Sequence, residues 1–317
     1  MAVVGTGIPG SENANTSGSL SHEVSTYYDK VFLDRARFEF VLKEGGQSRT
    51  HPTNEGRTVR FTRYDPLTIV TTPLGEASNP VTCAISASNV DVTLSEYGLT
   101  VNTSKMLSLV SIDSNMKEKI ELVGQNMGET LNRLVRNELG NGTQYIPNGH
   151  TTGNVAAGDT LSASSIREMT RTLEMNKAMK YSGGYFLGKT PPQSKYSLLG
   201  DTTWVNAKTY SDVKDLYNGE MGELYNVRWL LNIDVASAVG DASLAACTVV
   251  MYYTYVHGDN SFGTYDLEKD KPKLYILPNL VDSGSPAGRL SKISWAGSYA
   301  AKILNSNWAL LGKFTGA

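Results

Sequence analysis

Apolar side chains recur at every third or fourth position between Asp113 and Leu139, and charged side chains fill most positions between them. This period is typical of an amphipathic α-helix. Asp113 suits the N-cap, and the run Gly140-Asn141-Gly142 suits the helix end. At 1.5 Å per residue such a helix spans roughly 40 Å, which indicates a strut. The predicted apolar stripe comprises Met116, Ile120, Val123, Met127, Leu131 and Leu134.

Residues 56–110 follow a different pattern, in which polar and apolar side chains alternate between turn residues. In "GRTVRFTRYDPL" (Gly56–Leu67), Val59 and Phe61 share one side of a strand, and Arg60 lies on the other. The region is sparsely apolar and rich in Thr, Ser and Asn, so it predicts an extended hairpin whose polar face needs a partner. The expected strands are Arg57–Tyr64, Thr68–Thr72, Val90–Leu94 and Leu99–Val110.

The rest of the chain predicts shorter elements. A short helix is expected between Val24 and Lys43, and a second follows Leu161, with Ser165 and Glu168 as a capping-box pair and an end near Lys180. The final segment, 289–314, reads as one long strand or a strand pair. The tyrosine-rich stretch Val249–Tyr265 predicts a central strand followed by a polar loop. Short strands are expected at Tyr185–Leu187, Val227–Ile233, Thr248–His257 and Lys273–Leu277.

Composition limits the possible partners. The 317 residues are 40% hydrophobic and 19% charged, which is enough to bury a core, and the net charge is −2. A domain that depends on gripping phosphates is usually strongly basic, so any contact with nucleic acid should be local or weak. Residues 1–25 are rich in Gly, Ser, Asn and Thr and cannot bury enough apolar area to order themselves. They predict an arm held by a partner subunit.

The sequence contains few candidate residues for catalysis or metal binding. Cys83 and Cys247 are far apart and predict buried free thiols, while His22, His51, His150 and His257 predict exposed loop positions. Neither a metal, a cofactor nor a catalytic pair is indicated, so the sequence predicts a protein that is not an enzyme. We find neither a signal peptide nor an apolar run of the ~20 residues that a membrane helix needs, which favours an origin in the cytoplasm.

One motif favours an enzyme. "GGYFLGKT" (Gly183–Thr190) matches the G-x-x-x-x-G-K-[ST] pattern of a phosphate-binding loop. Such a loop needs a strand before it and a helix after it, so that backbone N–H groups cradle the phosphates. Here a predicted helix precedes the motif, and Pro191-Pro192 with "QSKYSLLGD" predicts no amphipathic helix after it. A chance match is favoured, and a P-loop NTPase stays as an alternative.

Several segments together resemble a family. "GRTVRFTRYDPL" is followed by "TTPLGEASNPV" and "LSEYGLTVNTSKML", and farther along come "YNGEMGELYNVRWL" (Tyr217–Leu230) and "WAGSYAAKILN" (Trp295–Asn305). Their order is similar to that in the N-four-type (N4-like) major capsid proteins of tailed bacteriophages, and the matched pieces span roughly residues 25–310. The resemblance implies the α+β Hong Kong-type phage major capsid fold.

In that fold the resemblance implies an order of parts along the chain. The parts are an N-terminal arm and short helix (1–45), an extended loop with strands of the peripheral domain (46–112), a spine helix of that domain (113–145), an axial domain (146–287) and a return strand of the peripheral domain (288–317).

The resemblance also implies a function and partners. The chain would assemble, as pentamers and hexamers, into the icosahedral head around double-stranded DNA. A portal protein would join it, with scaffolding and decoration proteins as further candidate partners. The packaged DNA would touch the inner surface weakly and non-specifically, and no membrane and no cofactor would be involved. The protein would be made in the host bacterial cytoplasm and reside in the virion capsid.

The polar face of the hairpin would then contact another copy, with the acidic face of the long helix as a candidate partner. A nanocompartment (encapsulin-like) shell protein of the same fold and a β-rich tail protein remain alternatives. The candidate contact residues are Arg57, Arg60, Arg63, Tyr64, Glu118, Glu121 and Glu129.

Overall fold

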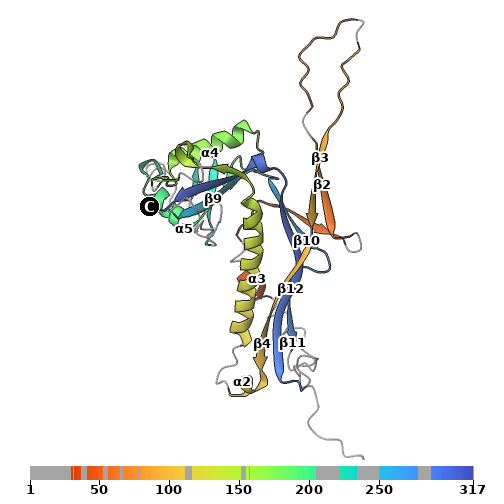
Figure 1. Ribbon diagram of the computed structural model, residues 1–317, viewed down its shortest axis with the longest axis vertical. Helices are drawn as coiled ribbons and strands as arrows, with labels where there is room; N and C mark the ends of the chain where they lie inside the picture. Colours follow the sequence, from red (N-terminus) through yellow and green to blue (C-terminus); the bar gives the residue numbers. More distant parts are fainter. Residues whose placement is uncertain are drawn as a thin grey trace, which may run out of the picture.

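The computed structural model is an elongated body with a compact lobe at one side and a long hairpin projecting past it (Figure 1). The predicted arm 1–25, the Asp113 cap, His22 and Cys247 lie outside the described residues. The structure describes residues 30, 32–36, 41–52, 56–64, 67–76, 79–110, 116–150, 155–156, 158–204, 222–233, 250–277 and 287–316.

The long helix is present as predicted. Helix α3 (Met116–Leu139) has 24 residues, so it is roughly 36 Å long, and it runs beside a tall sheet (Figure 1). Its stripe Ile120, Val123, Met127 and Leu131 is buried, which confirms that part of the predicted face, while Leu134 is only partly buried. The buried stripe continues through Val135 and Leu139. Residues 32–36 are also helical and pack on α3.

The tall sheet has five strands and shares a hydrophobic core with α3. Its axis is β12, which pairs with β4 along one edge and with β11 and β10 along the other, all antiparallel. Trp295 of β12 is buried against α3, and its Nε1 donates to Asn126 Oδ1 at 3.0 Å. The strands are β1 (Gln47–His51), β4 (Ser95–Ser104), β10 (Phe262–Leu267), β11 (Lys273–Leu277) and β12 (Leu290–Ile303).

The lobe contains a mixed six-stranded sheet in the order β5-β13-β9-β6-β8-β7. Helices α4 (Ala163–Met175) and α5 (Pro192–Leu199) contribute to a second core, in which Phe186, Trp229 and Phe314 are fully buried. The strands are β5 (Thr143–Tyr145), β6 (Phe186–Thr190), β7 (Gly222–Leu224), β8 (Val227–Leu231), β9 (Met251–His257) and β13 (Ala309–Thr315).

Three connections join the sheets. The chain passes from β4 through α2 and α3 to β5 in the lobe, then from β9 to β10 in the tall sheet, and it returns from β12 to β13 through the 3-10 turn η4 (Ser306–Trp308). Because β9 lies between β13 and β6, the predicted central strand of the tyrosine-rich stretch is confirmed. The closing segment is a pair of strands, one of the two forms expected, and its members belong to different sheets.

The hairpin forms its own two-stranded sheet from β2 (Thr58–Tyr64) and β3 (Ala87–Thr93). The predicted strand Thr68–Thr72 is wrong, because the ladder ends at the pair Tyr64–Ala87 and strand propensity without a partner does not form a strand.

The predicted strand Leu99–Val110 is also wrong beyond Ser104. The β4–β12 ladder ends at the pair Ser104–Leu290, and helix α2 (Lys105–Val110) begins there. Leu107 N donates to Ser104 Oγ at 3.2 Å, as at a helix N-terminus.

Helix α4 begins and ends earlier than predicted. Its N-cap is Ser162, whose Oγ accepts from Ser165 N at 3.4 Å. The predicted capping pair Ser165–Glu168 is wrong because Ser165 lies inside the helix, and Glu168 Oε2 accepts from the Tyr145 hydroxyl at 2.6 Å. Tyr145 precedes the 3-10 turn η1 (Pro147–Gly149). The helix ends at Met175, not near Lys180, because Lys177 adopts φ 52° and turns the chain out of the helix.

Candidate functional site

The base of the hairpin is anchored to the tall sheet by its apolar face. Phe61 is buried, and its ring meets the Tyr265 ring edge-on at a centroid distance of 4.7 Å. The Arg49 guanidinium lies over the Phe61 ring, 5.0 Å from its centroid. Val92 is buried in the same cluster. The first half of the ladder is therefore held rigidly, and it directs the rest of the hairpin away from the body.

The polar face of the ladder contains partners of its own. Arg60 faces Asp91 in register, and its Nε and Nη2 donate to the two carboxylate oxygens at 2.6 and 2.9 Å. Both side chains remain exposed, at 63% and 45%. The hydrogen bond to Arg60 lowers the pKa of Asp91. Arg60 therefore has a partner within its own chain, and contact of this face with an outside partner stays a prediction.

The other candidate hairpin residues differ in their surroundings. The Arg57 guanidinium donates to Leu94 O at 3.3 and 3.0 Å and so closes the base of the ladder. Arg63 and Tyr64 are exposed at the far end. Contact of these residues with a second copy stays a prediction.

The three glutamates proposed as their partners lie on α3. Glu118 is exposed, Glu121 is 3.8 Å from Lys117 Nζ, and Glu129 accepts from Gln125 Nε2 at 2.8 Å. Within one chain, then, Arg60 pairs with Asp91, and Glu121 and Glu129 have neighbours on their own helix. An interaction between these glutamates and the hairpin of a second copy is untested.

Exchanging the charges of Arg60 and Asp91 distinguishes a role of this ion pair within its own hairpin from a role in contact with another copy. We expect Arg60→Glu alone to weaken self-association, because like charges then face each other across the ladder. Arg60→Glu/Asp91→Arg should recover the parent's self-association, since the pair is restored within one hairpin. Sedimentation velocity of the three proteins gives the comparison. A folded double variant that still fails to associate would mean that Arg60 contacts a surface of another copy.

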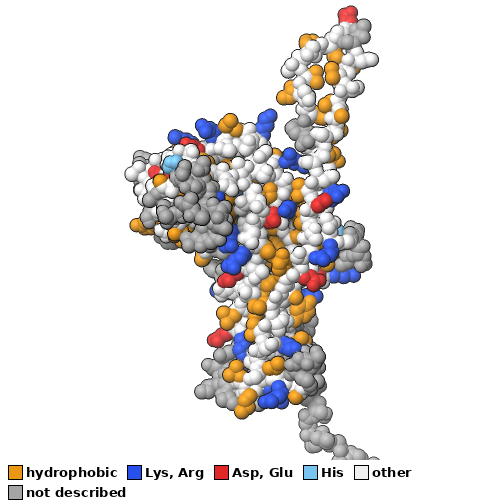
Figure 2. Space-filling model, in the orientation of Figure 1, with side chains coloured by type: hydrophobic (Ala, Val, Ile, Leu, Met, Phe, Trp, Pro, Cys, Tyr) orange, Lys and Arg blue, Asp and Glu red, His pale blue; other side chains and the backbone are white. Residues whose placement is uncertain are grey.

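The loop beyond the ladder is the most unusual surface of the molecule. Orange apolar side chains follow it to its end in Figure 2, and Glu76 is the one charged side chain among its described residues 67–76 and 79–86. Cys83 is also exposed here, so the predicted buried thiol is wrong for this cysteine. The large apolar side chains, each between 57% and 80% exposed, are Leu67, Ile69, Val70, Leu74, Val81 and Ile85.

The phosphate-loop motif is part of a sheet. Gly188, Lys189 and Thr190 lie in β6, which pairs with β8 on one side and β9 on the other, so these backbone groups face strands rather than a ligand. A helix does follow the motif, because Pro192 takes the first helical position of α5, where a missing N–H is tolerated, but α5 is short and not amphipathic, as the sequence predicts.

The Lys189 side chain has an internal role. It is fully buried, and its Nζ donates to Leu42 O at 2.7 Å and Glu44 O at 2.6 Å. The Phe262 ring of the other sheet lies 5.2 Å away. Burial lowers the pKa of Lys189 to about 7, against the opposing effect of Glu44. The lysine therefore fastens the turn 42–46 to the joint between the sheets and is unavailable to phosphate.

This geometry predicts that the protein does not bind ATP through the motif. We expect equilibrium dialysis with labelled ATP to give only background binding. A micromolar affinity for the parent protein would contradict the buried role of Lys189 and restore the nucleotide-binding interpretation. Lys189→Ala alone is a poor test, because it also removes the two hydrogen bonds that hold the turn.

Two histidines are buried rather than exposed, which corrects the prediction for them. His51 lies in β1 with Nε2 3.3 Å from Gly56 O. His257 lies in β9 with Nδ1 2.9 Å from the Tyr181 hydroxyl, which donates to Gly45 O at 2.7 Å. Burial, followed by the neighbouring Lys189 charge, keeps the pKa of His257 well below its ordinary value. Over the described part of the chain, His, Cys, Asp and Glu form no cluster suited to a metal.

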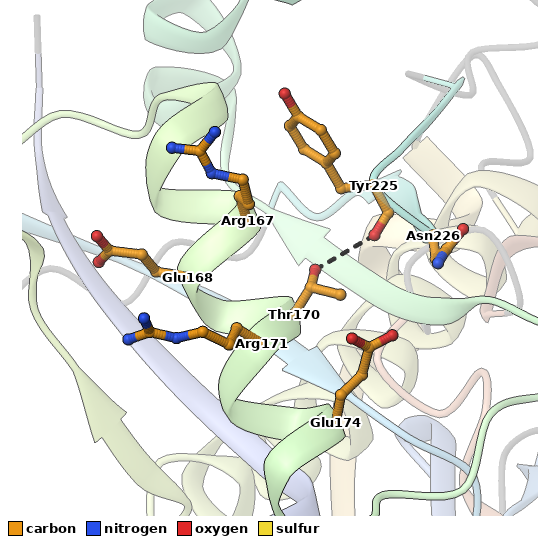
Figure 3. Close-up of a pocket in the computed structure, with 7 residues that line it drawn as sticks. All are labelled: Arg167, Glu168, Thr170, Arg171, Glu174, Tyr225 and Asn226. Carbon is orange, nitrogen blue, oxygen red and sulfur yellow. Dashed lines mark hydrogen bonds between the residues drawn. The ribbon is translucent and has the colours of Figure 1, made fainter.

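The pocket between α4 and the turn Tyr225–Asn226 has a volume of about 450 Å³ and offers no catalytic pair in the part of the chain that the structure describes (Figure 3). Its two arginines are matched by Glu168 and Glu174, which bind the Tyr145 hydroxyl and Lys180 Nζ at 2.6 and 2.8 Å. Thr170 Oγ1 donates to backbone carbonyls, including Tyr225 O at 3.3 Å. This pocket is therefore balanced in charge, and its acidic groups are already engaged.

The helices in the described ranges include none long and apolar enough to cross a membrane. No protein-family model and no curated protein sequence matches this chain.

Solved structures do match it, at low sequence identity. The capsid of Ralstonia phage GP4 has a TM-score of 0.65 at 11% identity, over 88% of each chain. The capsid of cyanophage Pam1 gives 0.65 at 16%, over 88% of this chain and 93% of that one. The capsid of the Helicobacter pylori bacteriophage KHP30 gives 0.61 at 12%, over 84% and 88%. The chain therefore has the α+β fold of phage capsid proteins.

Proposed function

We propose that this chain is a major capsid protein that self-assembles into the icosahedral head of a tailed bacteriophage around double-stranded DNA. The likeness to capsid chains supports this over most of the chain, although identities of 11–16% carry the fold alone. The order of the sequence motifs further favours the N-four-type (N4-like) subfamily.

The observation that carries the proposal is the apolar loop 67–86. The loop exposes six large apolar side chains, and exposed apolar surface of this kind usually marks an interaction site. The loop projects away from its own body on a ladder that Phe61 anchors (Figure 1), so its own chain offers no cover for its end. A second copy of the same chain is the partner that a shell supplies.

This arrangement favours rings. A projecting loop and the surface that receives it are different parts of the molecule, so the contact between copies is heterologous. Heterologous contacts that close give rings, which fits the pentamers and hexamers of an icosahedral shell. Each copy then contributes one loop and accepts another, so a contact of modest strength is repeated throughout the assembly.

In the proposed shell subunit the chain divides into five parts. Residues 1–45 form the arm and short helix, 46–112 the extended loop and peripheral strands, 113–145 the spine helix, 146–287 the axial domain and 288–317 the return strand. The portal, scaffolding or decoration proteins and the packaged DNA complete the partners, and the protein resides in the virion after synthesis in the host cytoplasm.

Sedimentation velocity of the purified chain tests the proposal. We expect fast-sedimenting particles, or pentamers and hexamers that convert to particles on concentration. A single species with the mass of a monomer at all concentrations would refute the function. The nucleic-acid content of the particles separates a phage head from a protein-filled nanocompartment.

A further inference from the structure

Strand β4 forms one outer edge of the tall sheet. Its ten residues pair with β12 in unbroken register from Ser95–Tyr299 to Ser104–Leu290, and none of the described strands pairs with its other side. In an antiparallel ladder every second residue directs its N–H and C=O away from the neighbouring strand. Along β4 these outward groups meet no further strand of the described chain, so they form a row of donors and acceptors open to another strand.

This edge lacks the features that usually prevent a strand from adding to a sheet. Such features include lysine, proline and bulges. Strand β4 contains neither lysine nor proline, its ladder has no bulge, and residues 97–104 carry no charge. The outer edge at β11 differs, because that strand is half as long, contains Lys273 and follows Pro272.

The exposure of β4 agrees with an open edge. Gly98, Leu99 and Thr100 are exposed in succession, although successive side chains point to opposite faces of a sheet. Tyr97 and Val101 pack on the core shared with α3, so Leu99 lies on that same face, and it is 42% exposed. A strand added here would therefore cover Leu99 with side chains of its own.

The apolar loop contains a segment that matches this edge. Residues 67–72, LTIVTT, are rich in β-branched side chains, which is why the sequence predicts a strand there, yet they form none within their own chain. They carry no charge, and Leu67 and Ile69 share one side of the segment when it is extended. The segment and the edge are thus two potential partners in a ladder, each without a strand partner in the described chain.

We propose that residues 67–72 of one copy add to the outer edge of β4 in a second copy and extend its sheet by one strand. The inference rests on the proposed function, because it names the surface that receives the apolar loop. Backbone hydrogen bonds would supply affinity, and Leu67 and Ile69 beside Leu99 would set the register. The hairpin projects away from its own body (Figure 1), so the loop of one copy does not reach its own β4 edge.

The area of the contact suits a subunit interface. The six large apolar side chains of the loop each bury roughly 100 Å² when a neighbouring copy covers them, which gives about 600 Å². A standard interface buries about 800 Å² per partner, and the backbone of the added strand supplies further area. The loop and the edge are different parts of the molecule, so the contact is heterologous and repeats from copy to copy.

Amide hydrogen exchange of the full-length protein tests the added strand. A synthetic peptide of residues 65–76, DPLTIVTTPLGE, is added to the dissociated protein, and mass spectrometry follows the exchange of each segment. We expect residues 95–104 to exchange about tenfold more slowly with the peptide than without it, because their outward N–H groups gain acceptors. Protection of other segments alone, or of none, would overturn the proposal.

Two leucines at different outer edges of the same sheet give matched variants. Leu99→Lys places a charge where the added strand would cover it, and Leu277→Lys makes the same change on β11, where the leucine is 38% exposed. Because both side chains are exposed in a single copy, both variants should fold. We expect Leu99→Lys to weaken peptide binding about tenfold, since covering an unpaired charge is disfavoured, and Leu277→Lys to change it little. Equal binding by the parent and both variants would overturn the site at β4.

Assembled samples distinguish this inference from the proposed function. Shells in which residues 67–72 exchange as fast as in the dissociated protein would overturn the added strand and leave the function intact. A protein that never assembles, yet binds the peptide at β4, would refute the function alone. If Leu99→Lys fails to fold, Leu99→Ser takes its place, because it removes the apolar contact without adding a charge.

Discussion

Replacing residues 65–86 by Asn-Gly should abolish shell formation and leave a folded subunit. The ladder ends at the pair Tyr64–Ala87, so a two-residue type I′ turn can join these ends directly. The base of the hairpin, with Phe61 against Tyr265, is retained. Circular dichroism and the thermal midpoint should therefore stay close to those of the parent.

The expected loss is large because the removed loop holds six large apolar side chains that are each more than half exposed. Burying one large apolar side chain contributes about 1.5–3 kcal/mol, so the contact of one loop is worth several kcal/mol. Every copy in a shell loses the same contact. The affinity between copies, which depends on many repeated contacts, is then too weak for shells to form at the concentrations at which the parent assembles.

Point variants give the matched control. Ile69→Ser/Val81→Ser should lower the yield of shells, and Thr71→Ser/Thr82→Ser, in the same loop, should not. Sedimentation and electron microscopy of the set provide the readout. Normal shells from the shortened hairpin would show that the apolar loop has no part in assembly.

Lys189→Met should remove most of the pH dependence of stability between about pH 7 and about pH 9. The folded pKa of Lys189 is about 7, below the ordinary value of 10.5. In this range the unfolded chain keeps the proton and the folded chain releases it, so the free energy of unfolding rises with pH by about 1.4 kcal/mol per unit. Above pH 10.5 the deprotonated lysine therefore does not lower the free energy of unfolding. As the pH falls from 10.5 to about 7, the free energy of unfolding decreases.

The groups around Lys189 do not cancel this slope. Glu44 acts to raise the pKa of the lysine, but burial dominates. His257, with its pKa held low, destabilises the fold only below its ordinary value of 6.5. Burial raises the pKa of Tyr181, so its effect begins near pH 10.

Chemical denaturation at about pH 7, 8 and 9 measures the slope. The methionine variant should be less stable than the parent at about pH 9, because Leu42 O and Glu44 O lose their donor at about 1–3 kcal/mol each. The difference in the free energy of unfolding between the parent and the methionine variant should become smaller toward pH 7. A parent whose stability is flat over this range would contradict the buried, neutralised lysine.

The long helix could be predicted from sequence because its packing follows a single period. The stripe Ile120, Val123, Met127 and Leu131 faces one continuous surface, so local pattern and tertiary burial agree. The central strand β9 was predictable for a similar reason, since most of its residues are apolar or aromatic, as is typical of a strand with neighbours on both sides.

The surroundings of single side chains could not be predicted in this way. Arg60 meets Asp91 only in one register, and the long loop between their strands does not fix that register as a two-residue turn would. Lys189 reaches Leu42 O, 147 positions away, so no local pattern contains that contact. Cys83 looked like a core residue because its neighbours are small or apolar, yet the loop that carries it projects from the body.

Electron microscopy of the purified full-length protein, at a resolution that traces the hairpin, tests the central claim most directly. We expect closed icosahedral shells of pentamers and hexamers in which the apolar loop 67–86 of each copy lies on the body of another. Monomers or open fibres in place of shells, or shells in which that loop points into solvent, would contradict it.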